Sequence, residues 1–204
     1  MNNVVAVEQA KSIMGENFIG PEELKKISFL RSDKYYPEIP FSADYLEGKK
    51  DEYILLLGVG TLFDGRAVTI RNLKSIFGKD PDNTEPCFYN QDWYDNECFI
   101  DEPIRNEWFL IRKDVYENSR AVQPVELMKS YKFPSAIMCT YAFFVTWLSL
   151  GIMLWKHDFV WCSDTDHNGD RIYVGKYFDV DGINKNGFSI HRHLALRSCY
   201  GCID

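Results

Sequence analysis

The sequence lacks the features that nucleic-acid binding and export require. Its 23 Lys and Arg are outnumbered by 30 Asp and Glu, for a formal net charge of −7 at pH 7. Phosphate binding needs clustered Lys and Arg, and no basic run occurs. The beginning, MNNVVAVEQAKSIMGENF, has no basic segment followed by an apolar stretch, so it is no signal peptide. We therefore expect a soluble cytoplasmic protein with no nucleic-acid partner.

The common catalytic motifs are also absent. The sequence contains no G-x-S-x-G, no H-E-x-x-H and no phosphate-binding glycine loop. A Cys–His pair could be drawn from Cys162 with His157 or His167, but the sequence gives no geometry for it. The sequence therefore leans away from an enzyme, and we predict no catalytic residue.

The 204 residues, of which 46% are hydrophobic and 26% charged, fit a single globular domain, 1–204. Residues 1–50 form a mainly helical segment, in which VVAVEQAKSIMG predicts one helix and GPEELKKISFL another. Strands are predicted from EYILLLGVG (52–60) and EWFLIRKDVY (107–116). Between them, Thr69 is expected to cap a short helix that ends at Gly78, and 79–99 is expected to be a structured loop.

Residues 133–155 carry no charge, which raises the question of a membrane span. Small side chains nevertheless recur at helical spacing, at Ser135, Cys139, Ala142, Thr146 and Ser149. Neither end carries the positive cluster that sets membrane topology. A buried helix in a soluble protein is therefore predicted, and membrane contact is not expected.

Three strand-like segments follow this helix: DFVWCS, RIYVGKYFDV and GFSIHRHLAL. They are joined by SDTDHNGD and DVDGINKNG, which are rich in turn-forming residues. The predicted fold class is α+β, with a long buried helix followed by an antiparallel strand meander.

The first of these joints begins like a calcium loop. Asp164, Asp166 and Asn168 occupy the first, third and fifth positions of an EF-hand loop, and Gly169 the sixth. The bidentate glutamate that should close the loop is replaced by Gly175, and strands flank the loop where helices are required. A bare Asp-Asn-Gly turn is the favoured interpretation, with a calcium site as the alternative.

A second candidate metal site lies near the end of the sequence. His191, His193, Cys199 and Cys202 form H-x-H-x5-C-x2-C, a set of side chains that suits tetrahedral zinc. Zinc ribbons and fingers, however, separate their two ligand pairs more widely. Separate structural roles are the alternative, and no cofactor is assigned beyond a candidate calcium or zinc ion. The six cysteines are expected to lie in a reducing compartment.

Two loops offer candidate ligand-binding residues. The segment CFYNQDWYDNECF combines the flat rings of Tyr89, Trp93 and Tyr94 with the amide of Asn90, a mixture that suits a sugar or peptide. The alternative is that these rings pin the loop onto the core, which is the more common role of large aromatics. The second loop contributes its polar residues: Asp181, Asn184 and Asn186.

The C-terminal half reads as a helix, a strand with Trp (FVWCSD), a hairpin (RIYVGKYFDVDG) and a closing run (NKNGFSIHRHLALRSCYG). This order resembles the end of bacterial C-type-lectin-like domains, such as relatives of the formylglycine-generating enzyme and the variable proteins of diversity-generating retroelements. The resemblance covers at most residues 107–204. It implies a ligand-facing surface of aromatic and Asn/Asp/Gly-rich loops, and binding rather than catalysis.

The leading hypothesis is a ligand- or partner-binding module that uses loops 88–94, 164–170 and 179–187, with a small molecule, a sugar or a protein as partner. One alternative is a zinc-stabilised protein or metal-dependent enzyme that uses the C-terminal His/Cys cluster. Another is a structural or assembly subunit in which helix 133–155 packs against another chain. The sequence does not determine the oligomeric state.

Overall fold

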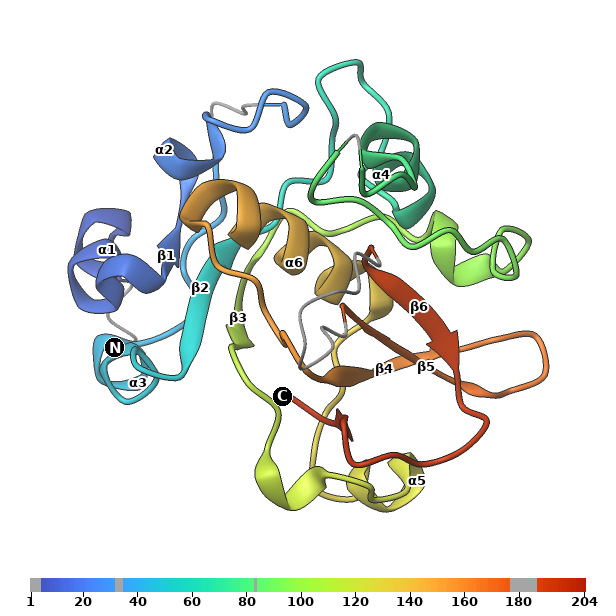
Figure 1. Ribbon diagram of the computed structural model, residues 1–204. Helices are drawn as coiled ribbons and strands as arrows, with labels where there is room; N and C mark the ends of the chain where they lie inside the picture. The colour runs from blue at the N-terminus through green and yellow to red at the C-terminus, as the bar shows by residue number, and fades with distance from the viewer. Residues whose placement is uncertain (1–4, 32–34, 83, 177–186) are drawn as a thin grey trace.

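A computed structural model describes residues 5–31, 35–82, 84–176 and 187–204 of the chain. Helices and strands are both present, and the strands form two mixed sheets, which confirms the α+β class. The long helix α6 (Ala136–Leu150) runs through the middle of the molecule, between the two sheets (Figure 1).

The first sheet has the order β1-β2-β3. Strand β2 (Tyr53–Leu57) is buried along its whole length, as the apolar run YILLL predicts. It pairs antiparallel with β3 (Trp108–Arg112), in a register that sets Leu55 opposite Leu110. On its other side it pairs parallel with β1 (Phe18–Ile19). Strands β2 and β3 were predicted, whereas β1 was not.

Short helices surround this sheet. They are α1 (Val7–Met14), α2 (Pro21–Leu24), α3 (Ala43–Glu47) and α4 (Ile70–Phe77). Pro21 occupies the first turn of α2 as predicted, but the helix ends at Leu24 and does not continue to residue 30. In α4 the Thr69 hydroxyl accepts a hydrogen bond from the Asn72 N–H (3.2 Å), and Gly78 ends the helix with a φ of +68°. The predicted cap and stop of α4 are therefore confirmed.

Helix α6 confirms the predicted buried helix within 133–155. Ser135 caps its first turn by accepting a hydrogen bond from the Met138 N–H (3.3 Å), and Gly151 ends it in the left-handed conformation. The ring of Phe144 stacks on Phe77 at a centroid distance of 4.1 Å and on Phe88 at 4.8 Å. Within the described ranges, every helix is too short or too polar to cross a membrane.

The second sheet has the order β6-β5-β4-β7. Strands β4 (Phe159–Thr165), β5 (Arg171–Gly175) and β6 (Ser189–Arg192) form the predicted antiparallel meander. Strand β7 (Tyr200–Gly201) pairs parallel with β4, which was not predicted. One face of this sheet packs against α6 in the main core. The other face carries an aromatic cluster covered by the segment that contains α5 (Pro124–Leu127).

Replacing Phe144 with alanine should lower the free energy of unfolding by about 3–5 kcal/mol, because it empties the centre of the aromatic core. Leu148→Ala, at a residue on the same helix that is 43% exposed, should cost on the order of 0.5 kcal/mol. Urea denaturation of both variants measures the two changes. Similar losses in the two variants would contradict the placement of α6 in the core.

Candidate functional site

The predicted calcium loop forms a turn between β4 and β5. One oxygen of Asp166, Oδ1, accepts hydrogen bonds from the backbone N–H groups of Asn168 and Asp170, both at 2.9 Å. Gly169 has a φ of +86°, a conformation that glycine adopts without strain. Asp164 instead bonds to α6, where its Oδ2 accepts from the Ala136 N–H at 2.6 Å. Asp164 and Asp166 therefore serve different parts of the fold, and the loop is closed by its own hydrogen bonds.

Asp166 forms an acidic cluster with Glu97 and His167, separate from Asp164. Within the described ranges, the one group of His, Cys, Asp and Glu side chains close enough to share a metal is Glu97, Asp166 and His167, with ligand atoms within 4.8 Å of one another. Glu97 Oε1 lies 2.6 Å from His167 Nδ1, and Glu97 Oε2 accepts from the His167 backbone N–H at 2.9 Å. Arg192 donates to Asp166 Oδ2 at 3.2 Å. These carboxylates therefore already have donors supplied by the protein.

The four predicted zinc ligands do not converge in this structure. His191 lies on β6, at one edge of the second sheet, whereas Cys199 and Cys202 flank β7 at the opposite edge. Strands β5 and β4 separate the two pairs. The His193 ring packs edge-on against Trp161 at a centroid distance of 5.1 Å. The structure thus gives these residues separate surroundings, which was the alternative interpretation.

The aromatic loop is held against the core. Tyr94 is fully buried, so it belongs to the core and not to an exposed binding face, which corrects its assignment as a ligand-binding residue. Trp93 is half-buried, and its indole N–H donates to the Ile190 carbonyl at 3.0 Å. Tyr89 is half-buried and Asn90 exposed. The remaining predicted ligand residues, Asp181, Asn184 and Asn186, lie outside the described residues.

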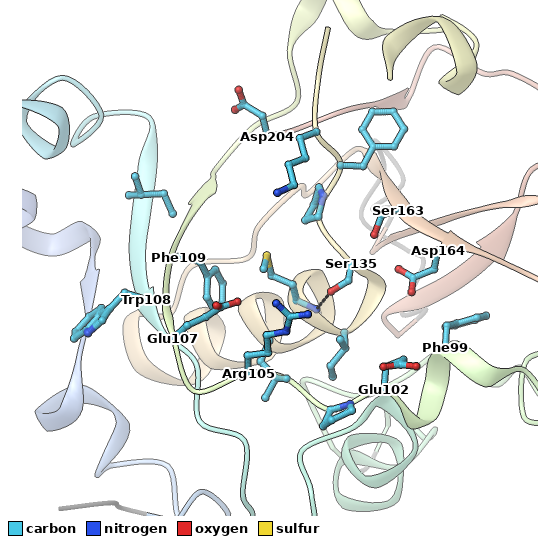
Figure 2. A pocket seen from close by; sticks show the side chains of 18 of the residues that line it. Phe99, Glu102, Arg105, Glu107, Trp108, Phe109, Ser135, Ser163, Asp164 and Asp204 are labelled. Carbon is cyan, nitrogen blue, oxygen red and sulfur yellow. Dashed lines mark hydrogen bonds between the residues drawn. The ribbon is translucent and has the colours of Figure 1, made fainter. Parts of the chain in front are cut away.

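A cleft of about 930 Å³ lies between the first sheet and the start of α6 (Figure 2). Segment 102–110, which includes part of β3, lines one side. Residues 132–138 and the end of β4, residues 163–165, also line it. Its apolar lining consists mainly of aromatic and long aliphatic side chains: Phe41, Phe99, Trp108, Phe109, Phe133, Ile137 and Met138. The cleft thus offers an apolar surface beside the first turn of a buried helix.

Charged groups lie around the α6 end of this cleft. Figure 2 shows Arg105 and Glu107 on one side of Ser135, and Asp164 and Glu102 on the other. As far as the chain is described, Arg105, Glu102 and Glu107 form no ion pair. Burial raises the pKa of Asp164 above its usual value; the Ala136 N–H opposes this shift, and the charge of Glu102 adds to it. Asp164 is therefore an acid whose charge the protein stabilises only in part.

The opposite end of the cleft has its charge paired. Asp204 Oδ1 accepts hydrogen bonds from the hydroxyl groups of Tyr53 and Tyr116, both at 2.6 Å. Lys49 donates to the Tyr53 hydroxyl at 3.3 Å, and its ammonium lies 4.4 Å from the Tyr53 ring centroid. Burial alone would raise the pKa of Asp204, but the two tyrosine hydrogen bonds outweigh it and hold the pKa below its usual value. One oxygen of this exposed carboxylate therefore already has two donors within the protein.

Comparisons of this chain with protein-family models, with curated proteins and with solved structures found no match. The resemblance of residues 107–204 to C-type-lectin-like domains therefore stays a prediction.

The sequence pointed to one residue of the cleft, Asp164, but as a calcium ligand. Ser135 could have been found as a helix cap, because it follows Pro134 directly at the start of the apolar run. Arg105 and Glu102 carried no local signal, since they come from an irregular segment before β3. Their role depends on how distant segments meet.

Two histidines should titrate on opposite sides of the ordinary histidine pKa of 6.5. Burial lowers the pKa of His191 to about 4, whereas the hydrogen bond that the His167 imidazole donates to the Glu97 carboxylate raises the pKa of His167. Proton titration of the imidazole resonances by NMR measures both. A His191 pKa above 6.5 would contradict its half-buried, neutral state.

The pH dependence of the stability of the fold should follow from these two pKa shifts. As the pH falls from 6.5 towards about 4, the unfolded chain protonates at position 191 before the folded chain does, so His191 costs stability in that window. His167 acts in the opposite sense, because its contribution is present at low pH and is lost as the pH rises through its raised pKa. His191→Phe should therefore flatten the loss of melting temperature below pH 6.5, and His167→Gln should not.

Calcium or zinc should leave the melting temperature unchanged, because the carboxylates of Glu97 and Asp166 are already hydrogen-bonded within the protein. Calorimetry of chelator-treated protein, before and after each metal is added, checks this expectation. A rise of several degrees would instead establish a metal site. Its loss in Glu97→Gln would then assign the metal to the acidic cluster, and its loss in Cys199→Ala to the predicted zinc ligands.

Proposed function

We propose that this protein binds a small organic molecule in the cleft between the first sheet and the start of α6. The observation that carries the proposal is a cleft of about 930 Å³ that combines apolar walls with a half-buried carboxyl group, Asp164. Small-molecule sites typically enclose about 300–1,000 Å³ and pair apolar surface with a few placed polar groups. The sequence left a small molecule, a sugar or a protein open as partner, and this cleft favours a small molecule over a protein.

The apolar walls would supply most of the binding free energy. Phe99, Phe109 and Phe133 line the cleft and are each less than a tenth exposed, so the walls belong to the folded core. Walls anchored in this way are already formed before a ligand arrives, which limits the entropy lost on binding. Burying the apolar body of a ligand against them contributes about 25 cal/mol for each Å² removed from water.

The polar groups support binding more than catalysis. A carboxyl group with a raised pKa in a cleft marks a candidate functional site, and Asp164 meets that description. The hydroxyl of Ser135, however, caps α6 through the Met138 N–H, and the described residues that line the cleft include no histidine to activate it. A ligand-binding protein is thus better supported than a hydrolase that uses serine.

Filling the cleft should abolish binding. Ser163 is exposed and its side chain lines the cleft, so Ser163→Trp should occupy the cleft without disturbing the core. Ser12→Trp makes the same change at an exposed position on α1, outside the cleft, and is the matched control. Ligand-observed NMR with a library of neutral, cationic, anionic and zwitterionic fragments should give hits for the wild type and for Ser12→Trp only.

Two results would contradict the proposal. One is a set of hits that bind Ser163→Trp as well as they bind the wild type, which would place the site elsewhere. The other is the absence of any hit with a wild-type chain whose melting temperature shows that it is folded. The melting temperature of each variant is measured alongside, so that a failure to fold is recognised.

A further inference from the structure

We infer that the ligand of the cleft is a zwitterion of the amino-acid type, whose ammonium group pairs with Asp164 and Glu102 and whose carboxylate pairs with Arg105. This inference rests on the proposed function and names its ligand class. It follows from the placement of three charged groups around the start of α6 and from the apolar wall between them.

The acidic side of the cleft should bind a positively charged group of the ligand. Asp164 accepts a hydrogen bond from the Ala136 N–H and lies close enough to Glu102 for the two charges to repel each other. The nearby Arg171 donates its own hydrogen bond to the Ser163 carbonyl and offsets this repulsion only in part. An ammonium group placed between the two carboxylates would relieve the repulsion and add charge-assisted hydrogen bonds.

The basic side of the cleft should bind a carboxylate group of the ligand. Arg105 is exposed and, within the described residues, has no ion-pair partner. Figure 2 shows its side chain extending towards Ser135, on the opposite side of the α6 start from Asp164. A planar guanidinium group matches the two oxygens of a carboxylate and binds them side by side. Lys132, which also lines the cleft and is exposed, adds positive charge.

Ligands of a single charge fit this arrangement less well. A plain anion that reaches Arg105 would meet three carboxylates at the α6 end of the cleft, those of Glu102, Glu107 and Asp164. A plain cation would satisfy Asp164 but leave Arg105 without a partner. Like charges brought together across an interface are strongly disfavoured, so a ligand with both charges is selected over either alone.

The apolar lining indicates what connects the two charges. Phe99 lies on the side of Glu102 and Asp164, and Phe109 on the side of Arg105 and Glu107 (Figure 2). Aromatic walls of this kind favour an apolar or aromatic side chain on the ligand. Amino acids with large apolar side chains, or the ends of short peptides, therefore combine the required groups.

Two charge-removing variants test the inference. Asp164→Asn removes the charge but keeps an oxygen that can accept from the Ala136 N–H, so the helix cap is retained. Arg105→Gln removes the positive charge at an exposed position. The probes are the common amino acids, to find the best one, followed by phenylalanine, phenylalaninamide and 3-phenylpropionate. These three share a body and carry both charges, the positive charge alone and the negative charge alone.

Calorimetric titration should rank phenylalanine first for the wild type, by about tenfold over each single-charge analogue, which corresponds to about 1.4 kcal/mol. Asp164→Asn should weaken phenylalanine and phenylalaninamide about tenfold and spare 3-phenylpropionate. Arg105→Gln should weaken phenylalanine and 3-phenylpropionate by a similar factor and spare phenylalaninamide. This crossed pattern would not arise from a general loss of structure.

The result that overturns the inference differs from the one that overturns the proposed function. Suppose that no amino acid binds better than its single-charge analogues, while neutral fragments still bind the wild type and not Ser163→Trp. The assignment of a zwitterionic ligand is then wrong, and the cleft remains a binding site. If neither amino acids nor fragments bind a folded wild type, both proposals fall. Equal losses for all three probes in both variants also overturn the charge assignment.

Discussion

The arrangement of this protein depends on the need to bury helix α6. Its sequence, AIMCTYAFFVTWLSL, contains no charge and is apolar on most sides, so one sheet could not cover it. The first sheet and the second sheet enclose it, and α4 closes the core through the stack of Phe77 on Phe144. Because both sheets must reach the helix, its first turn lies between them. The cleft is found at that place.

Asp164 joins the second sheet to the start of α6 and lines the cleft at the same time. Its hydrogen bond to the Ala136 N–H stabilises the helix terminus, where a negative charge is favoured. The same carboxyl group has a raised pKa because it is partly removed from water. A group that served only as a cap would gain stability if it were exposed and fully ionised. Its half-buried position is therefore better explained by the cleft than by the cap alone.

The sequence predicted those features that depend on neighbouring residues. The ends of α4 at Thr69 and Gly78 follow from local hydrogen bonds, and β2 follows from one apolar run. Pairings between distant segments were missed, as with β7, whose contact with β4 places Cys199 and Cys202 away from His191. Likewise, the contact of Glu97 with His167 and the approach of Arg105 to the start of α6 have no local pattern, because chain topology alone brings them about.

The charged groups at the two ends of the cleft differ in how many hydrogen-bond or ion-pair partners the protein already gives them. This difference determines at which end a polar contact with a ligand adds most binding free energy. Asp204 Oδ1 has two tyrosine donors, so a ligand that bound this oxygen would have to displace hydrogen bonds as good as those it formed. Arg105 and Glu102 have no ion-pair partner among the described residues, so a ligand there exchanges only water for its own charges. Polar recognition should therefore be concentrated at the α6 end.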